Sequence, residues 1–325
     1  MIPYEWFGQA QERISPHTVR TPLTHDAQRG MFLKWENQQI TGSFKARGAV
    51  NKVLSLQEWE RSAGLVAASA GNHGQGVALA GQLTGSKVEV FVPGHAVPSK
   101  VEAIRSLGGE LHFVNGGYGE TEVAALEYTR EKGKTFISPY NDGQIIAGQG
   151  TIALEVVQQL ADGFDTSPRD IAAWIFPTGG GGLISGCAAA LAAGGSRSSA
   201  FGVQPAASAF THSLFHRGTQ QGVSDNPTLA DGLSGAIDAD SITIPMLREF
   251  VADMVTVSEE EIERAIAVAW WLYGEKIEGS AATALAAVLE GTLAARPCVV
   301  ILTGGNIQRE VFDEIIARHP VQARQ

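Results

Sequence analysis

Short apolar runs alternate with longer segments of helical periodicity along this chain of 325 residues. Between the runs, residues 101–107 and 122–132 place apolar side chains three and four positions apart, which is the spacing of one helix face. A strand–helix–strand order of this kind predicts a parallel sheet covered by helices. The strands predicted in the first half of the chain are residues 65–69, 88–92, 111–114 and 135–137.

The same alternation resumes after Gly163 and predicts a second sheet, which suits a chain long enough for two lobes. Ser258 followed by Glu261 is a capping box, and it predicts a helix that carries Ile262, Ala265, Ile266 and Ala269 on its apolar face. Residues 217–240 are rich in Gly, Asp, Ser and Pro and are predicted to be a loop bordering a site. The strands predicted here are residues 172–176, 200–203, 254–257 and 299–302.

Composition and charge narrow the class of protein. Hydrophobic residues make up 44% of the chain, and no run approaches the roughly 18 apolar residues of a membrane span, so a globular protein with no membrane partner is expected. A net charge of -10 argues against nucleic-acid binding, because phosphate backbones need a positive field. The N-terminus resembles no targeting peptide, and Cys187 and Cys298 lie in apolar segments as expected of buried free thiols. We therefore expect a cytoplasmic protein.

The segment Thr41-Gly42-Ser43-Phe44-Lys45-Ala46-Arg47-Gly48 places one lysine between a polar turn and an apolar segment. A lysine must lose its proton before it can attack a carbonyl, and burial or a nearby cation favours that loss. Phe44 could supply apolar surface and Arg47 a positive charge. A solvated lysine in the first turn of a helix is the alternative, and this octapeptide alone does not decide between them.

Four consecutive glycines, Gly179–Gly182, follow the strand predicted at 172–176 and precede a helix predicted to start near Leu183. A loop without Cβ atoms can turn its N–H groups toward a phosphate at the positive end of a helix. The segment contains neither the G-x-x-x-x-G-K-[ST] pattern of nucleoside-triphosphate loops nor the G-x-G-x-x-G pattern of dinucleotide loops. A single phosphate monoester is favoured, with a tight turn that binds nothing as the alternative.

Two further segments follow predicted strands. Residues 69–76 open a helix whose N–H groups suit a carboxylate, although Asn72 as an ordinary cap and His73 as a surface histidine are equally simple interpretations. Thr303 supplies a hydroxyl after the strand predicted at 299–302. The carboxyl ends of parallel strands are where open α/β sheets bind ligands. A lysine, a phosphate loop, a carboxylate loop and a hydroxyl together match pyridoxal phosphate and an amino acid.

Along nearly its whole length the chain resembles the fold-type II pyridoxal-phosphate enzymes, most closely the branch of threonine/serine dehydratases (ammonia-lyases) and serine racemases. The resemblance implies an α/β fold similar to the tryptophan synthase β subunit, with two open, mostly parallel sheets flanked by helices. It further implies a cofactor cleft between a large domain (residues 1–47 and 142–325) and a small domain (residues 48–141) that moves over the substrate, and a homo-oligomer. The segments that carry the resemblance are residues 41–48, 69–73, 147–151, 179–182 and 303–306.

The resemblance also implies roles for individual residues. Lys45 is the catalytic Schiff-base lysine and removes the α-proton of the substrate, so that β-elimination yields a 2-oxo acid and ammonia. The implied cofactor-binding residues are Phe44, Lys45, Asn72, Gly179, Gly180, Gly181, Gly182, Leu183, Glu278 and Thr303. The implied substrate-binding residues are Ser69, Ala70, Gly71, Asn72, His73 and Gly235. The resemblance also implies that the neutral hydroxyl of Thr303 lies beside the pyridine nitrogen, which would favour elimination over transamination.

Three departures from the family pattern refine the expected activity. Ala70 stands where racemases of the family carry a serine, so we expect little racemisation. Gln204 and Phe210 stand where some members have the carboxylates of a divalent-metal site, so we expect no metal there. The residues after Glu278 differ from those of many threonine dehydratases, which leaves the preference between L-threonine and L-serine open, with phenylserine-like and hydroxyaspartate-like substrates behind them.

Other activities remain possible on the sequence alone. A racemase or a β-replacement synthase would use the same cofactor, and a non-catalytic protein that binds a phosphorylated ligand would explain the glycine run. The chain ends soon after a helix predicted to start near Ile307, so no C-terminal regulatory domain is expected.

Overall fold

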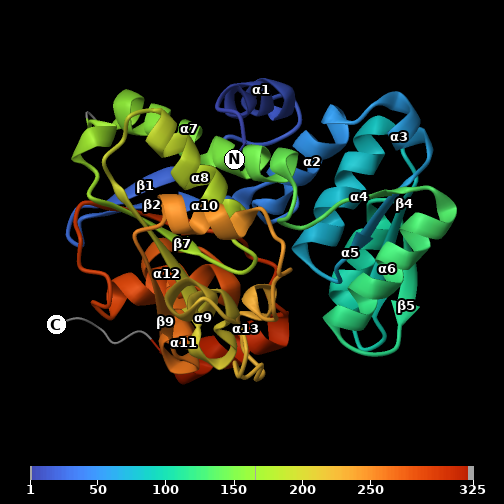
Figure 1. Ribbon diagram of the computed structural model, residues 1–325. Helices are drawn as coiled ribbons and strands as arrows, with labels where there is room; N and C mark the ends of the chain where they lie inside the picture. The colour runs from blue at the N-terminus through green and yellow to red at the C-terminus, as the bar shows by residue number, and fades with distance from the viewer. Residues whose placement is uncertain (1, 165, 321–325) are drawn as a thin grey trace.

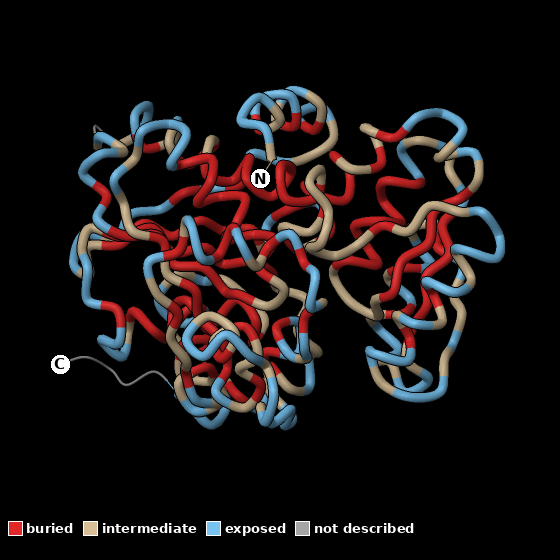
Figure 2. The backbone as a smooth tube through the Cα atoms, viewed as in Figure 1, coloured by how far each residue is buried: buried red, intermediate tan, exposed pale blue. Residues whose placement is uncertain are grey.

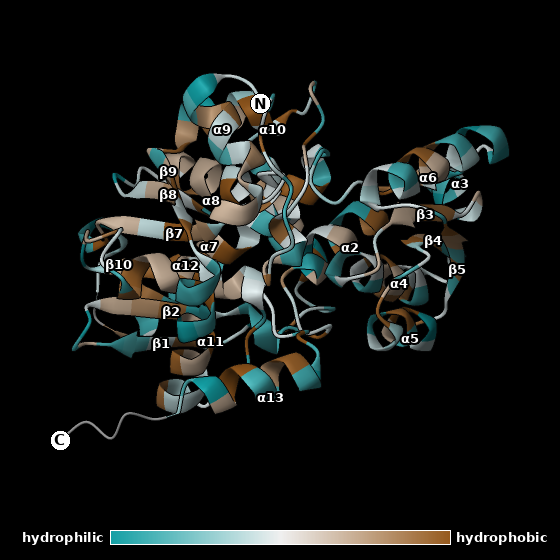
Figure 3. Ribbon diagram, turned by 90° about the horizontal axis from the view of Figure 1, so that it is seen from below, coloured by the Kyte–Doolittle hydropathy of each residue, from teal (hydrophilic) through white to brown (hydrophobic). Residues whose placement is uncertain are grey.

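A computed structural model of the protein describes residues 2–164 and 166–320, which form two lobes side by side (Figure 1). The larger lobe contains a six-stranded sheet in the order β1-β2-β10-β7-β8-β9, and Figure 3 shows these strands lying one above another in this order. Its strands are β1 (Leu23–Asp26), β2 (Met31–Trp35), β7 (Ala173–Pro177), β8 (Ser199–Pro205), β9 (Asp253–Val257) and β10 (Cys298–Leu302).

The smaller lobe contains a four-stranded sheet in the order β5-β4-β3-β6, and all of its strand pairs are parallel. In the large sheet only the pair of β1 and β2 is antiparallel. Two mostly parallel sheets flanked by helices confirm the predicted fold class. The strands of the small sheet are β3 (Leu65–Ala68), β4 (Val88–Pro93), β5 (Gly109–Val114) and β6 (Thr135–Phe136).

Helices cover both faces of each sheet. The helices of the large sheet are α1 (Glu5–Ile14), α7 (Gly143–Gly163), α8 (Gly182–Ala193) and α10 (Thr243–Phe250) on one face, and α11 (Glu259–Tyr273), α12 (Gly279–Leu289) and α13 (Arg309–Arg318) on the other. The helices around the small sheet are α2 (Lys45–Ser55), α4 (Asn72–Thr84) and α5 (Pro98–Ser106) on one face and α6 (Tyr118–Lys132) on the other. The remaining helices are α3 (Glu58–Ser62) and α9 (Phe210–Arg217), with short 3-10 turns at η1 (Glu36–Gln38), η2 (Pro168–Asp170), η3 (Ala206–Ser208) and η4 (Asp231–Leu233).

Apolar clusters lie on both faces of each sheet, and Figure 2 shows buried backbone in the middle of each lobe. In β10, Val299 and Ile301 join one apolar cluster, while Val300 and Leu302 join the cluster on the opposite face. Strands buried in this way are continuously apolar rather than alternating, which is why β3, β7 and β10 were recognisable as short apolar runs in the sequence. All eight strands predicted from the sequence are present, and Ser258 caps α11 together with Glu261 as predicted.

The hairpin of β1 and β2 was missed. Lys34 interrupts the apolar pattern of β2, although its side chain is fully buried and pairs with Glu155 of α7. Cys187 and Cys298 are buried free thiols, as predicted. The strands of the small sheet all lie within residues 48–141, but the domain boundaries themselves stay a prediction. Among the described residues, no helix combines the length and the apolar character needed to cross a membrane.

Candidate active site

A cavity of about 380 Å³ lies between the two lobes, at the carboxyl ends of strands from both sheets. Its volume falls in the range typical of small-molecule sites. The wall contains every residue that the sequence analysis assigned to the site, although the individual roles stay predictions. These residues are Phe44, Lys45, Ser69, Ala70, Gly71, Asn72, His73, Gly179, Gly180, Gly181, Gly182, Leu183, Gly235, Glu278 and Thr303.

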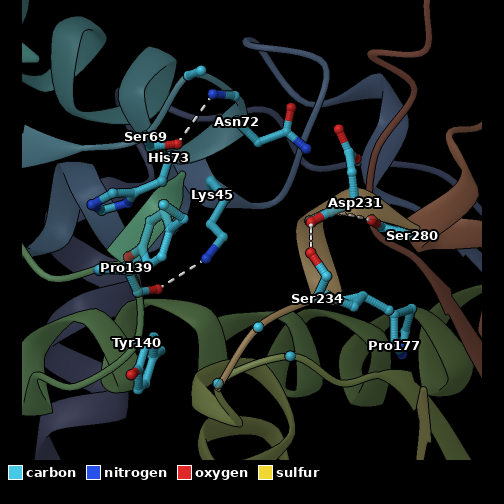
Figure 4. A pocket seen from close by; sticks show the side chains of 18 of the residues that line it. Lys45, Ser69, Asn72, His73, Pro139, Tyr140, Pro177, Asp231, Ser234 and Ser280 are labelled. Atoms are coloured by element: carbon cyan, nitrogen blue, oxygen red, sulfur yellow. Dashed lines mark hydrogen bonds between the residues drawn. The ribbon is translucent and has the colours of Figure 1, made fainter. Parts of the chain in front are cut away.

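Lys45 is the first residue of α2, and its Nζ donates a hydrogen bond of 2.9 Å to the carbonyl oxygen of Pro139 (Figure 4). The segment before Lys45 is fixed to the end of β10, because the N–H of Phe44 donates to the carbonyl oxygen of Thr303. Burial lowers the pKa of Lys45 to about 8, against a smaller opposing effect of Glu278. The amine is therefore more easily deprotonated than an exposed lysine, as a carbonyl-binding lysine requires.

Arg47 does not have the role suggested by its position two residues after Lys45. Its guanidinium is buried between Glu36 and Glu155, at 2.7 and 3.0 Å, and these two carboxylates compensate its charge. The expectation that Arg47 lowers the pKa of Lys45 is wrong, since burial is the cause. Arg47 instead attaches the first turn of α2 to the large lobe.

Residues 147–151 lie in α7 behind Lys45 and not on the cavity wall. A Cβ atom on Gly148 would come within 2.7 Å of the Cα atom of Gly48 in α2, so only glycine permits this close contact. Gln149 adds a hydrogen bond of 3.2 Å from the N–H of Gly48 to its Oε1 atom. This segment therefore supports the helix that begins with Lys45.

The four-glycine loop connects β7 to α8. Gly181 has a φ of +85°, a conformation that favours glycine, and a Cβ atom on Gly180 would lie 2.3 Å from the ring of Tyr140. The carbonyl oxygens of Gly179 and Gly180 accept hydrogen bonds from threonine hydroxyls outside the cavity. The first N–H groups of α8 have no partner within the helix, so the loop can bind an anion.

Asn72 begins α4 on the opposite side of the cavity. Its Nδ2 atom donates to Glu278, and its Oδ1 atom accepts from Asn306, each at 2.7 Å. Burial raises the pKa of Glu278 to about 7, and the nearby Asp231 carboxylate adds to the rise. The amide of Asn72 is thus held in one orientation at the cavity wall.

His73 is buried, which rules out the alternative of a surface histidine. Its Nε2 atom lies 2.7 Å from the carbonyl oxygen of Ile137 and donates to it, because a carbonyl can only accept. Burial, reinforced by the charge of Lys45, lowers the pKa of His73 to about 3. The imidazole is therefore neutral at physiological pH, and what His73 offers an anion is its backbone N–H in the first turn of α4.

Several cavity residues were missed by the sequence analysis. Tyr140 follows β6 and packs against Gly180 and Gly182, and its hydroxyl accepts from the N–H of Asp238 at 3.0 Å. Lys100 of α5 reaches across the cavity to Asp231 of η4 at 2.5 Å. His95 and Tyr118 also line the wall. Tyr140 and His95 both follow strands, so the rule that located Thr303 would have found them if it had been applied to every strand end.

Taken together, these features define a class of protein: a two-lobed α/β protein whose lobes meet at a cavity with a deprotonatable lysine and a phosphate-type glycine loop. Comparisons with known proteins agree with this class. Residues 14–304 match the family model described as pyridoxal-phosphate dependent enzyme. The chain therefore belongs to this family, and its cofactor is pyridoxal phosphate.

Individual relatives are similar over nearly the whole chain. An L-threonine ammonia-lyase of Thermotoga maritima is 37% identical over 99% of this chain and 80% of its own length. The catabolic L-threonine dehydratase TdcB of Escherichia coli K12 is 38% identical over 88% of this chain and 85% of its own length. The structure of maize serine racemase superimposes with a TM-score of 0.87 at 30% identity, covering 98% of each chain.

The residues present fit the cofactor chemically. Lys45 would bind the aldehyde carbon, because its amine lies on the wall and has a lowered pKa. The loop from Gly179 to Leu183 would hold the phosphate, because its carbonyl oxygens are bonded away from the cavity. Thr303, buried at the end of β10, would offer the ring a neutral hydroxyl.

Proposed function

We propose that this protein is an ammonia-lyase that converts a β-hydroxy amino acid, L-threonine or L-serine, to a 2-oxo acid and ammonia. One observation carries the proposal: a lysine of lowered pKa, a glycine loop and the N-terminus of α4, which can bind a carboxylate, all line the same cavity. The printed names of the Thermotoga maritima and Escherichia coli relatives support this choice of reaction.

The residues of this chain divide the work as follows. Pyridoxal phosphate supplies an aldehyde that condenses with amines and a ring that withdraws electrons from the neighbouring carbon. The N–H groups at the start of α4, beginning with Asn72, would bind the substrate carboxylate. Lys45 would hold the cofactor aldehyde in the resting enzyme, and its Nζ atom would take the α-proton of the bound substrate.

Loss of that proton is followed by cleavage of the Cβ–O bond. The hydroxyl is protonated as it leaves as water, which balances the α-proton taken by Lys45. The enamine product then reacts with water to give the 2-oxo acid and ammonia. Thr303 would offer the ring a hydroxyl rather than a carboxylate, so the ring would withdraw electrons less strongly. Elimination is thereby favoured over transamination.

The test is a substrate panel with the purified holoenzyme. L-Threonine and L-serine should each yield equal amounts of 2-oxo acid and ammonia, and Lys45→Ala should abolish both products. Lys52→Ala is a suitable control, because Lys52 is a partly buried lysine on the same helix that pairs with Asp142. Formation of cysteine from O-acetylserine and sulfide, without 2-oxo acid from serine, would instead indicate a β-replacement synthase.

A racemase is the second candidate, and the structural similarity to maize serine racemase favours it. Against it stands Ala70, which lines the cavity without a group that can transfer a proton. Chiral analysis of the serine left after partial turnover decides between the two. D-Serine formed at a rate near that of pyruvate would contradict the proposed lyase.

We further propose that the protein is a cytoplasmic homo-oligomer in which the small domain, residues 48–141, moves over the substrate. The resemblance to the fold-type II enzymes supports the oligomer, and the exposed Trp270, Trp271 and Leu272 at the end of α11 offer apolar surface. Size-exclusion chromatography with light scattering would test it. A monomeric mass at micromolar concentration would overturn this part of the proposal.

A further inference from the structure

Two threonines outside the cavity bind the backbone of the four-glycine loop. Thr211 of α9 donates from its hydroxyl to the carbonyl oxygen of Gly179 at 2.6 Å, and Thr243 of α10 donates to that of Gly180 at 2.8 Å. Both threonines are fully buried. Neither lines the cavity, so neither can touch a ligand there.

These two bonds determine where the next N–H groups point. Within a planar trans peptide the C=O and N–H bonds point in opposite directions. When the carbonyl oxygens of Gly179 and Gly180 are bonded to threonines behind the loop, the N–H groups of Gly180 and Gly181 are turned to the opposite side, toward the cavity. No acceptor among the described residues bonds either N–H group. A run of glycines restricts its own backbone very little, so this restraint has to come from outside the loop.

The threonines are themselves held in place. The cap position of α9 is Ala209, which has no side-chain acceptor, and the buried Oε1 atom of Gln204 instead accepts the N–H of His212 at 2.7 Å. Gln204 thus caps α9 from the end of β8 and fixes Thr211. Thr243 uses its one hydroxyl proton on Gly180, so Ser241, at 2.8 Å, donates to the Thr243 hydroxyl.

We propose that Thr211 and Thr243 are positioning residues that aim the N–H groups of Gly180 and Gly181 at the cofactor phosphate, with Gln204 acting through Thr211. This inference rests on the glycine loop being the phosphate site. It assigns a cofactor-binding function to side chains that do not contact the cofactor.

The test compares two ligands that differ only in the phosphate. Apoenzyme is titrated at fixed pH with pyridoxal phosphate and with pyridoxal, in the wild type, Thr211→Val and Thr243→Val. Each valine variant should bind pyridoxal phosphate roughly three- to tenfold more weakly, as expected for one lost hydrogen bond. Binding of pyridoxal should be unchanged, and the conservative variants Thr211→Ser and Thr243→Ser should bind as the wild type does.

Thr121→Val is the matched control. Thr121 of α6 is also fully buried and donates to a backbone carbonyl at 2.7 Å, but it lies in the other lobe. An equal loss for both ligands, or the same loss in Thr121→Val, would show that the threonines act only on general stability and would overturn the inference. If Thr211→Val does not fold, Thr243→Val alone provides the same comparison.

A double variant tests the role of Gln204. Gln204→Met removes the acceptor at similar volume and should weaken pyridoxal phosphate binding as Thr211→Val does. In the double variant with Thr211→Val, Gln204→Met should cause no further loss of affinity for pyridoxal phosphate. In the double variant with Thr243→Val, the two fold-losses in affinity should multiply. If the fold-losses in affinity multiplied in both double variants, Gln204 would not act through Thr211.

The outcomes also distinguish a failure of this inference from a failure of the assignment of the glycine loop as the phosphate site. The wild type could bind pyridoxal as tightly as pyridoxal phosphate, with neither ligand displaced by inorganic phosphate. That result would contradict the assignment of the glycine loop as the phosphate site. A wild type that discriminates between the ligands, with valine variants that discriminate equally, would overturn only the role of the threonines.

Discussion

Asn72 donates a hydrogen bond of 2.7 Å from Nδ2 to Oε1 of Glu278, and this contact joins the start of α4 to the residue that precedes α12. Glu278 is one of the few carboxyl groups on the cavity wall. Burial raises its pKa to about 7 from the ordinary value of 4.5. A proton on this group is therefore coupled to folding.

The first prediction concerns the pH dependence of stability. Between pH 4.5 and 7 the folded apoprotein keeps the proton of Glu278 while the unfolded chain releases it. Because the folded state binds more protons in this window, the contribution of Glu278 to stability is present below pH 4.5 and is lost as the pH rises to about 7. The free energy of unfolding of Glu278→Gln should therefore rise relative to that of the wild type across this window and then stay level.

Urea unfolding of both apoproteins at several pH values measures this difference. Glu12→Gln, at an exposed glutamate of α1, is the control and should follow the wild type. A difference between wild type and Glu278→Gln that does not change with pH would contradict the raised pKa.

The second prediction concerns the rate at which apoenzyme captures its cofactor. Only the neutral amine of Lys45 attacks an aldehyde, and its pKa is about 8, so the rate should rise with pH through that value and level off above it. The growth of visible absorbance after mixing with pyridoxal phosphate gives the rate. Lys52→Ala should behave as the wild type and Lys45→Ala should show no such growth. A rate that continues to rise to the ordinary lysine pKa of 10.5 would contradict the effect of burial.

The sequence and the structure agree best where function depends on a local segment. The strand ends, the glycine loop and Lys45 are each contained in a few consecutive residues, and the shared edge of parallel strands then brings them together. What could not be predicted depends on partners distant in sequence. Arg47 was expected to lower the pKa of Lys45 by its positive charge. Glu36 and Glu155, which compensate that charge, lie in other elements and could not be identified from the local sequence.

The same limit explains the other differences. Lys34 is a charged residue within β2, and its buried partner Glu155 is 121 residues away in the sequence. The sequence pattern therefore did not predict β2. Thr211 and Thr243 are ordinary helix residues in the sequence, and only the folded chain places their hydroxyls against the glycine loop.

The third prediction concerns the ion pair between Lys100 and Asp231, which joins the two lobes at the cavity. If it holds the lobes together over the substrate, Lys100→Met and Asp231→Asn should each raise KM by about two- to fivefold, the range of a partly exposed pair. High salt should raise the KM of the wild type and leave the variants unchanged, because screening weakens such pairs.

Two variants decide whether Lys100 acts as a clamp or binds substrate itself. A clamp predicts equal effects of Lys100→Met and Asp231→Asn and partial recovery in the exchanged double variant K100D/D231K. If Lys100 bound the substrate carboxylate directly, Asp231→Asn would free it and lower KM. Arg309→Met, which removes an exposed pair with Asp313 on α13, is the control for a general charge effect.

The fourth prediction concerns stereochemistry at the α-carbon. Lys45 is proposed to remove the α-proton from one face, and racemisation requires a second group that returns a proton to the opposite face. Ala70, between Ser69 and Gly71 on the cavity wall, offers only a methyl group. Ala70→Ser should therefore raise the ratio of D-serine to pyruvate by about tenfold or more, a modest share of what general acid–base catalysis contributes.

Chiral chromatography of the reaction mixture measures the ratio, and Ala96→Ser is the control, because Ala96 lines the same cavity. A ratio in Ala70→Ser no higher than in Ala96→Ser would mean that residue 70 does not separate lyase from racemase chemistry in this chain.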